Sequence, residues 1–252
     1  KGVSMTAMMA ELYGKVTGCC RGKGGSMHLS DPQRGVLATS AIVGANLPIA
    51  VGAALSLKFK KLKNISVVFF GDGAVDQGVF FESLNFAALK KLPVLFVCEN
   101  NFYATNSAQK ARQPLDNIFK RAEMFGIKGW RCAGNNAQEV YDLAKKLIRK
   151  LRDNSSGPHL LECRTYRWKA HVGPDCDFQG GCRPKPELDA WISKCPIKKL
   201  EVFLLKAGLL TQSKIKKIRQ RINREIMRAE FLAKKSRFPS AGELTTDVYW
   251  KE

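Results

Sequence analysis

The sequence lacks the features that would mark a membrane protein or a protein built on metal-bound thiols. No apolar run reaches the length of a membrane span, and the nearest, from Ala41 to Leu57, is interrupted by Asn46 and Pro48. Eight cysteines are present, but none forms a Cys-x-x-Cys pair and no Cys/His group has zinc spacing. Scattered cysteines in a chain of 252 residues are typical of reduced intracellular thiols. We therefore expect neither a membrane span nor a disulfide framework.

The sequence also lacks an initial methionine, a signal segment, internal repeats and low-complexity tracts. Its first residues already resemble the interior of a fold, so we expect a further N-terminal portion to precede Lys1. The hydrophobic fraction of 45% and the charged fraction of 25% are those of an ordinary globular protein. A chain of this length can bury one full-sized core.

Acidic residues are scarce relative to basic ones, and the net charge is +20. The segment from Lys198 to Arg237 holds 13 Lys or Arg against 3 Glu and so supplies half of this excess. Such a face can bind nucleic acid, an acidic protein or a phosphorylated ligand. Aromatic residues are sparse there and no nucleic-acid-binding motif is present. We favour a solvated amphipathic helix or an acidic protein partner, and we do not expect nucleic-acid binding.

Helix and strand patterns alternate along the chain. We expect strands over residues 65–70, 93–98 and 160–166, and helices over 3–20, 41–59, 76–90, 136–151, 187–193, 197–207 and 212–235. The run 65–70 is continuously apolar, as in a strand covered on both faces. The alternation predicts an α/β fold with a doubly wound, mostly parallel sheet. We place the α/β domain at residues 1–186 and a helical C-terminal extension of it at 187–252.

Oxygen-bearing side chains follow two of the predicted strands. Gly71-Asp72-Gly73 ends the first apolar run, and Asn101 ends the second, 29 positions after Asp72. Ligands of open α/β sheets bind beyond the carboxyl ends of the strands, where both side chains would lie. Carboxylate and amide oxygens suit Mg²⁺, and glycines let the backbone approach a phosphate. The alternative is structural, because Gly-Asp-Gly is also a common turn and Asn-Asn a common cap.

Further motifs give these residues a family context. They are Arg21-Gly-Lys-Gly-Gly-Ser-Met-His28, Ile42-Val-Gly-Ala45, Gly71-Asp-Gly-Ala-Val-Asp-Gln-Gly78, Cys98-Glu-Asn-Asn-Phe-Tyr103 and Thr165-Tyr-Arg-Trp-Lys-Ala-His171. Together with the spacing of Asp72 and Asn101, they resemble the α subunit of a 2-oxo acid dehydrogenase E1 component, the pyruvate, branched-chain and acetoin dehydrogenase group. The resemblance extends over essentially the whole chain. It implies a transketolase-like fold that binds thiamine diphosphate.

The resemblance also implies roles for individual residues. Asp72 and Asn101 would bind Mg²⁺ through their side chains, and Tyr103 through its main-chain carbonyl. Other residues would contact the cofactor: Ala41 and Val43 at the aminopyrimidine, Gly73 and Ala74 at the diphosphate, and His171 at the diphosphate and in acyl transfer. A surface histidine is an equally good interpretation of His171 taken alone. His28, in the glycine-rich loop, is a further candidate for the wall of the site.

The implied activity is oxidative decarboxylation of a small 2-oxo acid, or the acetoin reaction, with acyl transfer to a lipoyl group. The implied cofactors are thiamine diphosphate and Mg²⁺. In the family the glutamate that activates the cofactor comes from the β subunit, so we expect an αβ or α2β2 assembly and no activity from this chain alone. The lipoyl group would be carried by an E2 partner.

Departures from the family pattern bear on the source of the chain. Val172 follows His171 where mitochondrial pyruvate enzymes carry a phosphorylatable serine, and Lys169 replaces a second loop histidine common in those enzymes. Thr105 stands where relatives often place a larger apolar residue under the cofactor. The Tyr-Arg pair that relatives direct at the diphosphate would lie before Lys1. We expect a bacterial, cytoplasmic enzyme, or a mitochondrial matrix enzyme if the source is eukaryotic.

Two other functions remain open at this point. One is another transketolase-like activity, such as half of a sugar transketolase, against which the Tyr166–His171 loop argues. The other is a non-catalytic scaffold or nucleic-acid-binding protein that uses the basic helix. This second hypothesis predicts salt-sensitive nucleic-acid binding and no uptake of thiamine diphosphate.

Overall fold

The computed structural model describes residues 1–153, 156–246 and 248. The chain forms two compact units, one of residues 42–207 and one that joins residues 1–41 to 208–252. This division differs from the boundary expected at 186/187. The first helix packs on the long C-terminal helix, so both ends of the chain belong to one unit. No helix among the described residues combines the length and apolar character needed to cross a bilayer.

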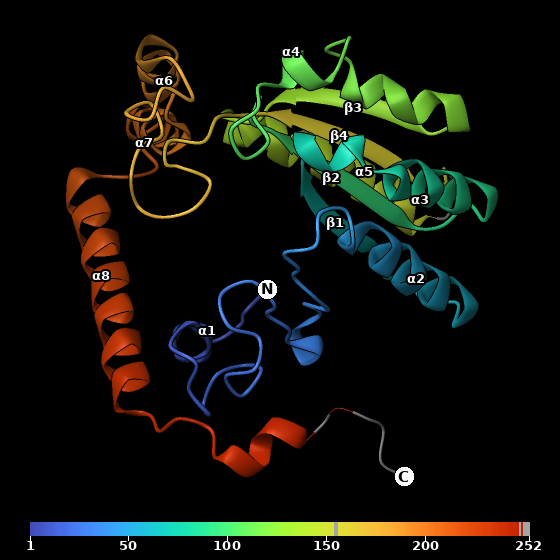
Figure 1. The fold of residues 1–252 in the computed structure, drawn as a ribbon. Helices are drawn as coiled ribbons and strands as arrows, with labels where there is room; N and C mark the ends of the chain where they lie inside the picture. Colours follow the sequence, from blue (N-terminus) through green and yellow to red (C-terminus); the bar gives the residue numbers. More distant parts are fainter. Residues whose placement is uncertain (154–155, 247, 249–252) are drawn as a thin grey trace. The chain divides into compact units, whose positions relative to one another are not determined.

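The unit of residues 42–207 is built on a four-stranded sheet (Figure 1). All of its strand pairs are parallel and the strand order is β1-β2-β4-β3. The strands are β1 (Ser66–Gly71), β2 (Val94–Asn100), β3 (Lys128–Ala133) and β4 (His159–Arg164). The helices and 3₁₀ turns of this unit are α2 (Asn46–Phe59), η2 (Asp72–Asp76), α3 (Gly78–Leu89), α4 (Gln109–Arg112), η3 (Ile118–Phe125), α5 (Ala137–Arg152), α6 (Lys185–Ile192) and α7 (Pro196–Lys206).

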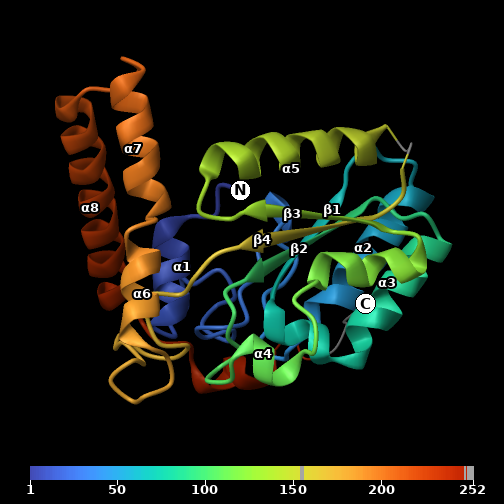
Figure 2. The same cartoon turned by 90° about the horizontal axis from the view of Figure 1, so that it is seen from above.

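Helices cover both faces of this sheet (Figure 2). On one face, α2, α3 and η3 form an apolar core around Phe80, Leu84 and Phe96. On the other face, α5 packs over β2, β3 and β4 through Leu147 and Leu151. Layers on both sides of a parallel sheet define the doubly wound α/β arrangement. The predicted fold class is therefore confirmed.

The outer strand β1 is covered less completely than its sequence suggested. Its buried residues alternate with exposed ones, and Val67 and Phe69 are 39% and 59% exposed. β1 is an edge strand, and the α5 core is built on the other three strands. The expectation that residues 65–70 are covered on both faces was wrong. The strands that are buried over most of their length are β2 and β4 in the middle of the sheet.

Two helices start later than expected. α2 begins at Asn46 rather than Ala41, since Gly44 has a φ of +84°. Between β1 and α3 the chain first makes the 3₁₀ turn η2, and α3 begins only at Gly78. Strand β3 and turn η3 were not expected from the sequence. The helix near 136–151 was, and the side chain of Asn136 accepts a hydrogen bond from the Glu139 amide as its N-cap.

The second unit contains α1 (Met5–Leu12), η1 (Pro32–Arg34), α8 (Gln212–Lys235) and η4 (Ala241–Thr245), with α1 packed on α8. α8 has the bounds expected from its spacing. The first helix was expected over residues 3–20 but ends at Leu12, because Gly14 adopts a φ of +66°. The following residues form the glycine-rich loop instead.

Candidate functional site

The first two strands end side by side and deliver the predicted ligands to the same edge of the sheet. Gly71, the last residue of β1, pairs in register with Glu99 of β2. Asp72 follows β1 directly and Asn101 follows β2 directly. The backbone of Asn101 is close enough to the Asp72 carboxylate to influence its pKa. The structure therefore brings these two residues together, as the spacing of their strands predicts.

Asp72 is fully buried, and its two carboxylate oxygens have different surroundings. Oδ2 accepts a hydrogen bond of 2.5 Å from Nη2 of Arg112. Oδ1 is buried and has no hydrogen-bond partner among the described residues. Burial raises the pKa of the Asp72 carboxyl above its ordinary value, while the hydrogen bond and charge of Arg112 oppose this rise. A buried oxygen without a donor is costly unless another group binds it.

Asn101 and its neighbour Asn100 turn the chain sharply after β2. Asn101 Oδ1 accepts a 3.3 Å hydrogen bond from the Tyr103 amide, and Asn100 Oδ1 accepts one of 3.0 Å from the Phe102 amide. Asn100 is fully buried, whereas Asn101 is partly exposed. Asn100 thus supports the turn from inside the unit, and Asn101 is the asparagine of the pair with access to a ligand.

Tyr103 uses its side chain for structure. Its hydroxyl donates a 2.8 Å hydrogen bond to Glu187 Oε2 on α6, and its ring lies edge-on against Tyr166. Burial raises the pKa of the phenol, and the neighbouring Glu187 carboxylate raises it further. The phenol is therefore a neutral donor at ordinary pH. This arrangement agrees with a ligand role for Tyr103 through its main chain only.

The turn after β1 has little space for a side chain at Gly73. A Cβ built on Gly73 would lie 3.1 Å from the Cβ of Ala104, so this turn packs closely on the loop after β2. Ala74 is buried in the same turn. Val43 is exposed, and the adjacent Gly44 lies against Val79, whose Cγ1 would be 2.9 Å from an added Cβ. The Val43 segment therefore borders the start of α3, directly after η2.

These residues fit a hard divalent cation. The turn presents one buried carboxylate oxygen without a partner, beside an amide-bearing side chain and backbone carbonyls. Oxygen donors of this kind are what Mg²⁺ prefers, with the remaining positions taken by phosphate and water. A pocket of about 500 Å³ opens next to the Asn101 loop and is lined in part by Tyr103, Gln109 and Gln113.

His171 lies on the loop between β4 and α6, and its side chain is exposed. Asp177 joins the base of this loop by accepting hydrogen bonds from Arg167, at 3.0 Å, and from Arg183. Although burial raises the pKa of Asp177, these hydrogen bonds hold it below its ordinary value. Arg167 also donates to the carbonyl of Thr105 at 3.0 Å. The loop is therefore attached to the segment after Tyr103, but no described contact joins His171 to Asp72.

Two further candidates lie in the other unit. Ala41 and His28 are both exposed there. Their proposed contacts with the cofactor stay predictions.

A buried glutamate that the sequence did not point to organises the segment behind the site. Glu162 of β4 is fully buried and accepts a 2.7 Å hydrogen bond from the side chain of Asn100. Its other oxygen accepts from the Phe119 amide and from Arg131, each at 3.1 Å. Glu162 was expected only as part of the strand over residues 160–166. A charged residue inside that run was the signal that could have identified it, since buried charges are paired.

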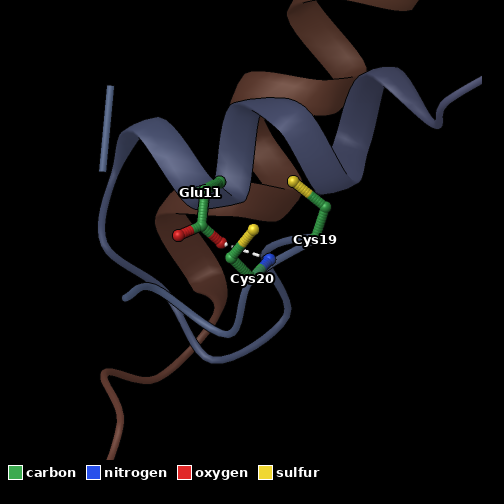
Figure 3. A group of neighbouring side chains, drawn as sticks. All are labelled: Glu11, Cys19 and Cys20. Atoms are coloured by element: carbon green, nitrogen blue, oxygen red, sulfur yellow. Dashed lines mark hydrogen bonds between the residues drawn. The ribbon is translucent and has the colours of Figure 1, made fainter. Parts of the chain in front are cut away.

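In the unit of residues 1–41 and 208–252, Glu11, Cys19 and Cys20 form another cluster of possible metal ligands (Figure 3). Both Glu11 oxygens are already used by the backbone of the glycine-rich loop. Oε2 accepts from the amides of Cys20 and Gly22 at 2.8 and 2.9 Å, and Oε1 from those of Gly24 and Gly25 at 2.7 and 3.2 Å. Burial raises the pKa of the Cys19 thiol, with a contribution from Cys20. We interpret this cluster as the internal support of the loop.

The comparison with known families decides the assignment. The model of the family described as "Dehydrogenase E1 component" matches residues 1–241. The chain belongs to the dehydrogenase E1 component family. Asp72 and Asn101, at the ends of β1 and β2, lie within the matched residues.

Similar E1 proteins come from bacteria and plants. The α subunit of acetoin:2,6-dichlorophenolindophenol oxidoreductase from Bacillus subtilis is 40% identical, over 99% of this chain and 73% of the relative. The pyruvate dehydrogenase E1 component subunit alpha of Rickettsia bellii is 35% identical, over 98% and 75%. The chloroplastic subunit alpha-3 of Arabidopsis thaliana is 37% identical, over 99% and 59%. The chain therefore spans about three fifths to three quarters of these relatives.

A comparison of structures found a protein described as a thiamin diphosphate-dependent enzyme from Mycobacterium smegmatis. It is 24% identical, with a TM-score of 0.41 over 52% of this chain and 24% of that one. This likeness is too slight to bear on the fold or the site.

Proposed function

We propose that this chain is the α subunit of a 2-oxo acid or acetoin dehydrogenase and that it binds the magnesium-held diphosphate of thiamine diphosphate. The observation that carries the proposal is the buried, unpartnered Oδ1 of Asp72 beside Asn101 at the joint end of β1 and β2. The family match and the names of the relatives, which are acetoin and pyruvate dehydrogenase α subunits, support it independently.

In this proposal Asp72 Oδ1, Asn101 Oδ1 and the Tyr103 carbonyl hold the cation. The backbone of Gly73 and Ala74 lies against the diphosphate, where the absence of a side chain at Gly73 permits close approach. Ala41 and Val43 contact the aminopyrimidine, and His171, exposed on its loop, assists acyl transfer. When bound, thiamine diphosphate supplies the electron sink for decarboxylation of the substrate. The chain's own part is to bind and orient it.

The partner of this subunit is an E1 β subunit in an αβ or α2β2 assembly, and the acyl acceptor is a lipoyl group carried by an E2 protein. The α subunit names of the relatives support the first of these partners. We place the assembly in a reducing compartment, the cytoplasm of a bacterium or the mitochondrial matrix of a eukaryote, because all eight cysteines are free thiols. Recovery of the native protein with its disulfides formed would contradict that location.

The test of this function is a turnover assay with an artificial electron acceptor. Pyruvate, a branched-chain 2-oxo acid and acetoin are each offered to this chain, to the β subunit and to their mixture. We expect acceptor reduction only from the mixture, and only with Mg²⁺ and thiamine diphosphate present. Turnover by this chain alone, or none by the assembled complex with any of the three, would contradict the proposal.

A further inference from the structure

Arg112, the last residue of the short helix α4, joins the two segments that carry the cation ligands. Its Nη2 donates to Asp72 Oδ2 at 2.5 Å and its Nη1 donates to Asp76, both in the turn after β1. Its Nε donates to the carbonyl of Ser107 at 3.3 Å, in the loop after β2. All three nitrogens of the guanidinium group are thus engaged, which fixes the plane of the group.

Burial distinguishes this arrangement from an ordinary surface ion pair. The Asp72 side chain is 0% exposed and that of Arg112 only 16%. Exposed ion pairs contribute little because solvent screens them, whereas a buried carboxylate depends on its partner to remain charged and oriented. Arg112 also touches only one of the two Asp72 oxygens, Oδ2. The other, Oδ1, is left buried and without a partner.

The residue after Arg112 reinforces the same turn. Nε2 of Gln113 donates to the Asp72 carbonyl at 3.0 Å and to Asp76 Oδ1 at 2.9 Å. Gln109, one helical turn earlier, donates from Nε2 to Gln113 Oε1 at 3.0 Å, and its own amide donates to the Phe102 carbonyl at 2.7 Å. Helix α4 is therefore attached both to the Asp72 turn and to the loop that carries Asn101 and Tyr103.

We propose that Arg112 is a positioning residue for the cation site. It holds Asp72 through Oδ2 and thereby presents Oδ1 as the single oxygen available to a divalent cation. This inference rests on the proposed function, because it assumes that Asp72 is a ligand. Partners of ligating carboxylates in the outer shell of a metal site set ligand orientation, and their loss typically weakens metal binding about 10- to 100-fold.

A competing role for Arg112 predicts the opposite change in the affinity for a divalent cation. If the guanidinium only substituted for an absent cation, its removal would relieve competition and a divalent cation would bind more tightly. The unpartnered state of Oδ1 favours positioning, because a substitute cation would be expected to engage both oxygens of a buried carboxylate.

The test measures cation binding rather than turnover. Mn²⁺ is titrated into the αβ complex in the presence of thiamine diphosphate, and free Mn²⁺ is followed by electron paramagnetic resonance. The variants are Arg112→Gln, which removes the positive charge and the planar guanidinium group, and Arg112→Lys, which keeps the positive charge but not the guanidinium group. Lys110→Gln is the matched control, because Lys110 is an exposed basic residue of the same helix. It reports the effect of removing one positive charge from α4.

We expect Arg112→Gln to weaken Mn²⁺ binding about 10- to 100-fold, Arg112→Lys to fall between this variant and wild type, and Lys110→Gln to stay within about twofold. Affinity of Arg112→Gln equal to or tighter than that of Lys110→Gln would overturn the inference while leaving the proposed function intact. A wild-type complex that binds no Mn²⁺ would overturn the proposed site and this inference with it. If Arg112→Gln does not fold, Arg112→Lys decides, and unchanged affinity in that folded variant counts against the inference.

Discussion

The side-chain amide of Asn100, at the end of β2, donates a 2.7 Å hydrogen bond to Glu162 of β4, and both residues are fully buried. Glu162 is also paired with Arg131 at 3.1 Å and with Arg164 at 3.2 Å. This contact fixes the residue before Asn101 from inside the sheet. The orientation of one proposed ligand therefore depends on a charge buried in the neighbouring strand.

Glu162→Ala should lower the free energy of unfolding by about 1–3 kcal/mol, since it leaves the buried side-chain amide of Asn100 without its acceptor, while Arg131 and Arg164 keep Asp116 as a partner. Chemical denaturation measures this loss. Glu99→Ala is the control, because Glu99 lies on the adjacent strand with its side chain exposed, and it should change stability by less than about 1 kcal/mol. Equal effects of the two substitutions would show that the buried network contributes nothing specific.

Tyr103→Phe should separate the structural role of this side chain from the proposed ligand role of its carbonyl. The variant loses the hydroxyl bond to Glu187 of 2.8 Å and should lose about 1–3 kcal/mol of stability. Its Mn²⁺ affinity should remain within about twofold of wild type, because the main chain is unchanged. A large loss of Mn²⁺ binding at unchanged stability would mean that the phenol itself serves the site.

Much of this site was predictable because it depends on short-range patterns. Strand-ending glycines and the 29-residue separation of Asp72 from Asn101 place both at one edge of a parallel sheet. The partners of Arg112 and Glu162 could not be predicted, although the charge of Glu162 inside a strand marks it as a residue that needs a partner. Each acts across the fold, on a residue 40 or 62 positions away, and nothing in the local sequence indicates which partner it finds. The incomplete cover of β1 was missed for a similar reason, since strand order is set by distant pairings.

The stability of the sheet should decrease on mild acidification because of His159. This residue is buried on β4, and burial, with the nearby charges of Lys150 and Lys128, lowers its pKa below the ordinary value. The unfolded chain therefore binds a proton that the folded chain resists. Stability is full above about pH 6.5, the usual pKa of histidine, and falls as the pH drops toward the lower folded-state value.

Denaturant unfolding between pH 7.5 and 5.5 tests this effect. His159→Gln should show a flatter dependence of stability on pH than wild type, whereas His28→Gln, at an exposed position, should keep the wild-type slope. Parallel pH profiles for wild type and His159→Gln would remove His159 as the cause.

Glu11→Gln should loosen the glycine-rich loop of the other unit. The substitution replaces one acceptor oxygen by an NH2 group that faces backbone donors, and it removes the charge that strengthens all four bonds. We expect a loss of about 2–3 kcal/mol and faster hydrogen exchange at the amides of Cys20, Gly22, Gly24 and Gly25. Ser26→Ala, exposed in the same loop, is the control. Unchanged exchange in Glu11→Gln would refute this support role.

The central claim is that Asp72 holds the cation that binds the cofactor diphosphate. The most direct measurement is a calorimetric titration of thiamine diphosphate with Mg²⁺ into the αβ complex, comparing wild type, Asp72→Ala and Asp142→Ala, whose aspartate is exposed on α5. We predict that Asp72→Ala weakens binding by more than about 100-fold, beyond what loss of an outer-shell partner causes, while Asp142→Ala binds as wild type does. Wild-type affinity in a folded Asp72→Ala complex would contradict the account.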